Sequence, residues 1–332
     1  MRARGMDNEE EGASWSKVTA EDWKEMASDN EGQPQRTLLL VHGTGLRTRP
    51  GFIGLTKEEY QRLDAAYGGR ILAFEHRALM HHLDRNSREL AAGLETGGIP
   101  LDLDVIGLSR GGLVVRMLVE GWQSLRADIR VRKLVFVGTP NDGTPSARRD
   151  RLGAGAREIK AWRQHVRGLA MVDQRDRAVE VYTDPFQIGG FDASTKECLG
   201  WPLLFGTQDQ LPQSAFLQRL NGFSGVAPHP VHDTIYYGVA SVFNFDHGAP
   251  NEPVLTHDTR RSICEWALPD TPNDLVVPTA GVFQPDQGPD ACGRFPLESD
   301  RLMVLQPSCN ATHTGIFRLR AVRQRIMDWL EV

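Results

Sequence analysis

Short, mostly apolar runs recur along the chain and alternate with longer segments whose apolar residues follow a helical period. The six clearest runs span residues 37–41, 71–74, 103–106, 134–137, 235–240 and 302–305. Runs of this kind are typical of strands buried on both faces of a parallel sheet. Strands that alternate with helices predict right-handed βαβ units. We therefore expect an α/β fold with a mostly parallel central sheet and helices on both faces.

Start and stop signals define the helices between these runs. Thr56-Lys-Glu-Glu59 matches a capping box, so a helix begins there and stops at Gly68-Gly69. Asn86 is the expected N-cap of a second helix, which ends at Gly97-Gly98, and a third helix is expected over 110–122. The last helix carries one apolar face, formed by Ile316, Leu319, Val322, Ile326 and Trp329.

Two regions depart from this alternation. Residues 1–34 are polar and acidic, and Trp15, Val18 and Trp23 predict a short surface helix with disorder before it. Residues from about 145 to 232 separate two strands, which is too long for a plain crossover. We interpret this stretch as an inserted cap or lid. The chain is thus expected to hold a polar N-terminal extension, 1–34, and a single domain, 35–332, that carries the insertion.

Composition narrows the class of protein. The 332-residue chain has a formal net charge of −5, which does not favour a nucleic-acid partner. No apolar run follows the charged N-terminus and no stretch is long enough to span a membrane, so we expect a cytoplasmic protein. The four cysteines form no C-x-x-C pair and are expected to be reduced.

The segment Gly107-Leu-Ser109-Arg-Gly111 carries the clearest chemical signal. It matches the G-x-S-x-G pattern and lies between a predicted strand and a predicted helix, as a nucleophile elbow requires. Small residues at 107 and 111 permit a sharp turn that exposes the Ser109 hydroxyl at a helix N-terminus, where negative charge is favoured. Ser109 is therefore the candidate nucleophile. The alternative is a glycine-rich turn with an incidental serine.

The loop that follows the first buried strand, Val41-His-Gly-Thr-Gly45, is suited to an oxyanion hole. One backbone N–H would come from Thr44 and the other from Arg110, the residue after the nucleophile. Gly43 allows the loop to approach a substrate closely. We interpret His42 as a structural brace for this loop rather than as a general base.

A serine nucleophile needs a base and a group that orients the base. His313 follows the last predicted strand in a polar loop, and it is the candidate base; His247 and His257 are its rivals. Asp274 precedes a short apolar run closed by a proline, which can hold its carboxylate rigidly behind the imidazole. The competing acids are Asp142, Asp246 and Asp270.

Several motifs together resemble those of bacterial lipase-like serine α/β-hydrolases, the broad group that includes PGAP1-type and LCAT-type esterases. The matching segments extend over nearly the whole chain and begin at Leu39, Ala73, Gly107, Val137 and Asn273. The resemblance implies ester hydrolysis by a triad of Ser109, Asp274 and His313, without a metal or an organic cofactor.

The chain departs from these relatives at two points. Leu108 stands where lipases of the group usually carry His before the serine. The N-terminus is also short, so we expect the first two strands of the full fold to be absent. Relatives with similar motifs occur in bacterial conflict and signalling systems, which implies a regulated effector with a protein partner.

The predicted insertion bears on substrate and partners. Its basic residues surround one amphipathic helix and would attract anionic phospholipid, although a solvated charged helix face gives the same pattern. These residues are Arg148, Arg149, Arg151, Arg157, Lys160, Arg163 and Arg167. Arg110 is a candidate partner for a substrate phosphate or carboxylate, or else a brace of the elbow. His81-His82 with Asp84 lacks a complementary cluster, and no metal site is expected.

The leading hypothesis is hydrolysis of a carboxylic ester or lipid through an acyl-enzyme on Ser109. A thioesterase, an acyltransferase or a serine peptidase would use the same triad. A different class of function is a latent or partner-gated protein that keeps the hydrolase fold for binding. The sequence leaves the acyl group unassigned, because the acyl pocket would lie in the insertion.

Overall fold

The described strands of the computed structural model form one eight-stranded sheet in the order β2-β1-β4-β3-β5-β6-β7-β8. The structure describes residues 2–4, 14–16, 25–26, 33–44, 51–52, 54–78, 80–120, 125–147, 205–222, 233–243, 271–285 and 294–332. All neighbouring strands from β4 to β8 are parallel. These strands are β3 (Gln35–Val41), β4 (Ile71–Phe74), β5 (Leu101–Leu108), β6 (Ile129–Val137), β7 (Ile235–Ser241) and β8 (Leu302–Leu305). The six predicted strands and the α/β fold class are confirmed.

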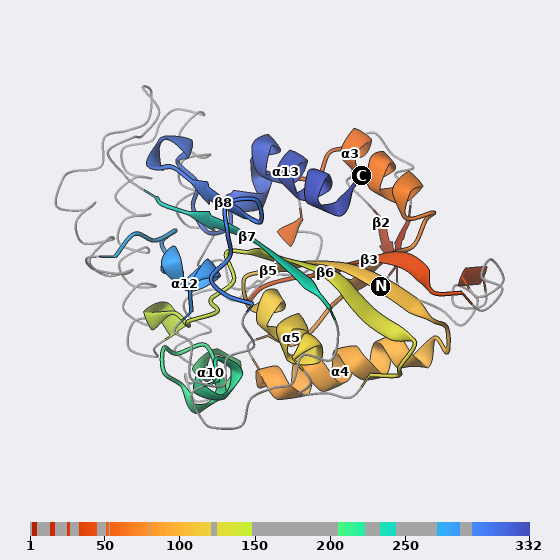
Figure 1. Ribbon diagram of the computed structural model, residues 1–332, viewed down its shortest axis with the longest axis horizontal. Helices are drawn as coiled ribbons and strands as arrows, with labels where there is room; N and C mark the ends of the chain where they lie inside the picture. Colours follow the sequence, from red (N-terminus) through yellow and green to blue (C-terminus); the bar gives the residue numbers. More distant parts are fainter. Residues whose placement is uncertain are drawn as a thin grey trace, which may run out of the picture.

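Helices cover both faces of the sheet (Figure 1). One face carries α4 (Leu83–Thr96) and α5 (Arg110–Val119), with α10 (Ala215–Leu220) and α12 (Ala280–Phe283) beside them. The other face carries α3 (Lys57–Ala66) and α13 (Arg320–Leu330). No described helix combines the length and the apolar character needed to cross a membrane.

The central strand β5 shows why the sheet forms where the apolar runs lie. Leu103 and Val105 point into the core under α4 and α5, whereas Ile106 and Leu108 point into the core under α3 and α13. Each of these side chains is at most 6% exposed. Burial on both faces requires consecutive apolar residues. Because β5 lies between β3 and β6, its carboxyl end is near the centre of the sheet.

The observed helix boundaries show which of the predicted helix starts are correct. The Thr56 capping box is present at the start of α3. Asn86 is not an N-cap: α4 begins at Leu83, and Asn86 is fully buried inside it. The Asp209 carboxylate accepts a hydrogen bond of 2.7 Å from the Leu83 N–H. The helix start is therefore stabilised by a residue far along the chain. The residues around position 83 give no sign of this contact.

The N-terminal segment adds two strands to the sheet, so the expectation that they are absent is wrong. β1 (Arg2–Arg4) and β2 (Ser14–Ser16) pair with each other in antiparallel fashion, and β1 pairs with β4. Trp15 lies in β2 and not in a helix, although residues 25 and 26 are helical. Strands of three residues, here Arg-Ala-Arg and Ser-Trp-Ser, are too short to give an apolar run or a recognisable alternation, and the pattern of the sequence therefore missed them.

The structure describes two parts of the predicted insertion, residues 145–147 and 205–222. A 3₁₀ turn (Pro145–Ala147) begins it, and α9 (Phe205–Gln208) and α10 follow in the second part. The basic helix predicted around 148–167 lies outside the described residues. The described part packs on the sheet domain, because Leu217 and Leu220 of α10 belong to the core under α4 and α5.

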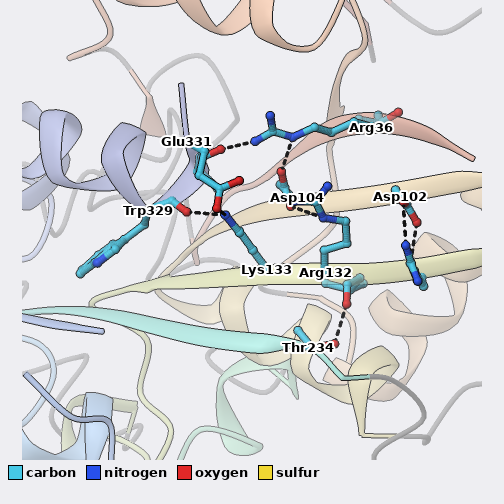
Figure 2. Close-up of polar contacts among 12 residues, drawn as sticks. Arg36, Asp102, Asp104, Arg132, Lys133, Thr234, Trp329 and Glu331 are labelled. Atoms are coloured by element: carbon cyan, nitrogen blue, oxygen red, sulfur yellow. Dashed lines mark hydrogen bonds and ion pairs between the residues drawn. The ribbon is translucent and has the colours of Figure 1, made fainter. Parts of the chain in front are cut away.

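The end of α13 is held to the sheet by a buried polar cluster at Asp104 (Figure 2). The Asp104 carboxylate accepts hydrogen bonds of 2.9 Å from Arg36 Nε and from the Tyr67 hydroxyl. The Arg36 guanidinium also donates to the Leu330 carbonyl, and Lys133 donates to the Trp329 carbonyl at 2.8 Å. The cluster joins β3, β5 and β6 to the last turn of the C-terminal helix. We call it the Asp104 clasp.

Candidate active site

Ser109 lies in a sharp, strained turn between β5 and α5. Its backbone has φ 50° and ψ −127°, in a region that residues with a side chain rarely adopt. The Ser109 N–H donates a 2.8 Å hydrogen bond to the Val137 carbonyl of the neighbouring strand β6. The side chain sits at the N-terminus of α5, and the residue is 8% exposed. The predicted elbow is thus present in the structure.

Gly107 and Gly111 allow the elbow to pack as closely as it does. A Cβ atom at Gly107 would lie 2.6 Å from the Gly112 Cα, inside the first turn of α5. A Cβ atom at Gly111 would lie 2.3 Å from the Val41 carbonyl oxygen. Any larger residue at either position would push α5 away from the sheet and shift Ser109.

His313 and Asp274 form a hydrogen-bonded pair. His313 Nδ1 lies 2.7 Å from Asp274 Oδ2, and the His313 N–H donates to the Asp274 carbonyl at 2.9 Å. Asp274 is 1% exposed, and the His313 side chain is 9% exposed. The structure therefore brings together the base and the acid that the sequence predicted separately.

The loop that carries Asp274 fixes the carboxylate in place. Asp274 Oδ1 accepts hydrogen bonds from the N–H groups of Val276, at 3.0 Å, and Val277, at 2.7 Å. A short antiparallel bridge joins Asn273 to Pro278 across the loop. One carboxylate oxygen is thus held by the backbone, and the other faces the imidazole.

Gly138 places the His–Asp pair beside the elbow. It directly follows Val137, the residue that accepts the Ser109 N–H, and a Cβ atom at Gly138 would lie 3.0 Å from His313 Cε1 and 3.3 Å from Asp274 Oδ2. The imidazole therefore packs over the chain next to Ser109. Gly138 belongs to a motif of the family resemblance, but no signal in the sequence predicts this role for it.

The loop after β3 lies directly against Ser109. A Cβ atom at Gly43 would be 2.8 Å from the Ser109 Cβ and 3.4 Å from its Oγ. His42 is fully buried, with Nδ1 2.9 Å from the Gly43 carbonyl and Nε2 accepting a 3.1 Å hydrogen bond from the His76 N–H. These contacts fit the neutral tautomer that carries its proton on Nδ1. Both ring nitrogens of His42 engage backbone groups, as expected of a brace.

The His76 ring stacks on His42, with 4.2 Å between the ring centroids. Its two ring nitrogens are shielded from solvent. Burial lowers the pKa of His76, and the neighbouring His42 and Arg110 lower it further. His76 is therefore neutral near pH 7.

Arg110 is a brace of the elbow rather than a group exposed to substrate. Its side chain is fully buried, and one guanidinium nitrogen donates a 2.7 Å hydrogen bond to the His81 carbonyl. Burial lowers the pKa of Arg110 to about 9, while Asp209 acts in the opposite direction. The guanidinium is thus held inside the protein at the His81 carbonyl, and the interpretation of Arg110 as a ligand for a substrate anion is not supported.

Thr44 contacts Gln210, a residue that the sequence motifs do not predict to be near the site. Gln210 Nε2 donates a 3.2 Å hydrogen bond to Thr44 Oγ1, and Gln210 is 4% exposed. Gln210 belongs to the second part of the predicted insertion, in a segment with no periodic pattern. No local signal in the sequence marks it as part of the site.

The rival candidates separate into two groups. His247, His257, Asp246 and Asp270 lie outside the described residues. Asp142 lies beside α12, where its N–H donates to the Gly281 carbonyl. His82 Nδ1 lies 3.1 Å from Asp209, and the described ranges hold no group of three or more His, Cys, Asp or Glu residues arranged to bind a metal. Cys309 is free and exposed.

The sheet, the serine elbow and the His–Asp pair at the carboxyl edge define a protein of the α/β-hydrolase fold. The chain belongs to a domain family of unknown function, DUF7379, whose pattern matches residues 4–331. Comparison with curated protein sequences finds no match.

Solved structures resemble the chain at the level of the fold. EstA from Clostridium botulinum is 14% identical with a TM-score of 0.50, and the match covers 90% of this chain and 87% of that one. The mature lipase BlEst2 from Bacillus licheniformis is 13% identical with a TM-score of 0.47, covering 91% and 93%. Phospholipase PlaB from Legionella pneumophila is 12% identical with a TM-score of 0.46, covering 75% of this chain and 45% of that one. The chain thus spans less than half the length of that phospholipase.

Proposed function

We propose that the protein is a serine hydrolase that cleaves carboxylic esters through an acyl-enzyme on Ser109. One observation carries the proposal: a strained serine at a helix N-terminus lies next to the strand over which His313 and its buried partner Asp274 are packed. A structural serine would not need a strained backbone, and a structural histidine would not need a buried carboxylate on Nδ1.

In the first half of the reaction, Ser109 Oγ attacks the ester carbonyl carbon while its proton passes to His313 Nε2. Asp274 keeps the other imidazole proton on Nδ1 and stabilises the cation that forms. The carbonyl oxygen becomes an oxyanion, which accepts hydrogen bonds from the Thr44 and Arg110 N–H groups. His313 then returns the proton to the leaving alcohol, and the acyl group stays on Ser109.

In the second half, a water molecule replaces the alcohol. His313 removes a proton from the water as its oxygen attacks the acyl carbon, and the same oxyanion site stabilises the second intermediate. Collapse of this intermediate releases the carboxylic acid and returns the proton to Ser109. Each group in the scheme belongs to the chain itself, so we propose that the reaction needs no metal and no organic cofactor.

The test is labelling with a fluorophosphonate probe, together with hydrolysis of p-nitrophenyl esters of increasing acyl length. Ser109→Ala and His313→Ala should each abolish labelling and lower kcat by about 10⁴-fold or more, because the triad acts as a unit. Ser299→Ala is the matched control, since Ser299 is an exposed serine in the turn before β8. The acyl length at which turnover is highest would give the size of the pocket.

The possible outcomes separate the alternatives. A matching series of thioesters tests the thioesterase alternative, and product transfer to an added alcohol tests the acyltransferase. Folded wild-type protein that neither labels nor turns over any substrate would contradict the proposal, and would favour a fold kept for binding or gated by a partner.

A further inference from the structure

A continuous chain of hydrogen bonds joins the proposed oxyanion loop to the loop that carries Asp274. It begins at Thr44, whose Oγ1 accepts from Gln210 Nε2 at 3.2 Å. The Gln210 carbonyl accepts from the Thr144 N–H at 2.7 Å. The Thr144 hydroxyl donates to the Val276 carbonyl, and the Val276 N–H donates to Asp274 Oδ1 at 3.0 Å. The two sides of the candidate active site are thus connected through one residue of the predicted insertion.

The surroundings of Gln210 leave it little freedom to move. Its backbone packs on Gly143, where an added Cβ atom would lie 2.9 Å from the Gln210 carbonyl oxygen and 2.7 Å from the Pro212 nitrogen. The preceding residue, Asp209, is held by the Leu83 N–H at the start of α4. Because the backbone of this segment is fixed on both sides, the Gln210 amide presents its N–H group to Thr44 at a defined position.

We infer that Gln210 is a positioning residue, which holds the loop at Thr44 in register with Ser109 and ties that loop to the Asp274 side of the site. The inference rests on the proposed function, in which the Thr44 N–H binds the oxyanion. Gln210 itself touches no reacting atom. Its contribution is to set the direction of a backbone donor, and such a donor is effective only within a few tenths of an ångström of its correct place.

The inference is tested on both partners of the Gln210–Thr44 hydrogen bond. Gln210→Met keeps the length of the side chain but removes the donor, and Thr44→Val keeps the shape but removes the acceptor. Each should lower kcat at least about tenfold with KM within about twofold, since one misplaced oxyanion donor affects the transition state. The double variant should be no worse than either single variant, because both remove the same interaction.

Two controls separate positioning from a general effect on folding. Thr44→Ser keeps the hydroxyl and should restore at least half of the wild-type kcat. Gln218→Met makes the same chemical change at an exposed position of α10 and should leave kcat unchanged. If Gln210→Met does not fold, the comparison of Thr44→Val with Thr44→Ser tests the same bond. Wild-type kcat in both Gln210→Met and Thr44→Val would overturn the inference.

Hydrogen–deuterium exchange of the peptide that covers residues 38–44 gives a readout independent of turnover. Loss of the Gln210–Thr44 bond should speed exchange in this peptide in Gln210→Met and in Thr44→Val, but not in Gln218→Met. An inactive wild type would refute the proposed function, whereas unchanged exchange in both variants would refute the tether.

Discussion

At the scale of single residues, Gly138 sets how closely the His313–Asp274 pair can approach the sheet. Its φ of +58° is in the left-handed region, and the imidazole occupies the space that a side chain would take. The residue after a central strand is therefore constrained twice, by its backbone and by its neighbour. Glycine alone meets both requirements without moving His313.

Gly138→Ala should lower kcat by about 100-fold, because the added methyl group would displace the His313 ring. The left-handed backbone should also cost about 1–2 kcal/mol of unfolding free energy. Steady-state kinetics and chemical denaturation measure the two effects. Gly93→Ala is the control: Gly93 lies in α4 with no atom within 4 Å of the added Cβ, so its unfolding free energy should rise slightly. An unchanged kcat in Gly138→Ala would contradict the close packing.

At the scale of elements, α5 is joined to α10 by a buried arginine. Arg116 Nε lies 2.6 Å from Glu120 Oε1 on the same helix, and its other nitrogens donate to Asn221 Oδ1 and to the Leu220 carbonyl. The Tyr236 hydroxyl also donates to Glu120. Helix α5, which begins directly after Ser109, is thus fixed to the described part of the insertion by a charged side chain with almost no solvent contact.

Arg116→Met should lower the unfolding free energy by about 3–5 kcal/mol, because it leaves the buried Glu120 without its arginine. The exposed pair Arg85–Glu89 offers a control with the same spacing of four residues on a helix. Arg85→Met should change the unfolding free energy by at most about 0.5 kcal/mol. Denaturant unfolding compares the two variants directly. Equal effects would mean that burial of the Arg116–Glu120 pair does not increase its contribution to the unfolding free energy.

The elements that the sequence predicted correctly are those with strong local signals. Runs such as 37–41 and 134–137 are buried on both faces, so their residue types alone identify them as strands. The start of α4 was misplaced because its N-terminal N–H group binds Asp209, which is distant in sequence. Strands β1 and β2 were missed because a strand of three residues is too short to show a pattern.

At the scale of the whole molecule, His76 should make folding sensitive to acid. Its folded pKa is lowered, so the unfolded chain binds more protons below the ordinary pKa of about 6.5. The stability that depends on a neutral His76 is present above that value and is lost as the pH falls below it. Unfolding midpoints measured from pH 8 to pH 5 should therefore decline through this range.

His76→Phe keeps a ring for stacking on His42 and should flatten the decline below about pH 6.5. His82→Phe is the matched control, because the His82 side chain is 56% exposed. This variant should keep the wild-type slope. A slope in His76→Phe equal to that of the wild type would show that other groups cause the acid sensitivity.

The candidate site was predicted in part. The residues that were predicted lie in local motifs, and the residue that was missed is brought to the site only by the fold. Ser109, Asp274 and His313 each follow or precede a strand in a recognisable local motif, and the fold brings these loops to the same edge of the sheet. Gln210 lies in the insertion, and only the folded chain places it against Thr44. Long-range contacts of this kind cannot be predicted from the neighbouring residues in the sequence.

The Asp104 clasp has a consequence for how the protein can be handled. It holds Leu330 against Arg36 near the start of β3, whereas the loop beside Ser109 follows the other end of that strand. The five steps along β3 from Arg36 to Val41 separate the two levels by roughly 16 Å, at about 3.3 Å per residue. A fluorescent domain fused after Val332, or a solid support linked at that position, would thus be attached on the side away from Ser109. The face that holds Ser109 would then be turned toward the surrounding solution in an immobilised molecule.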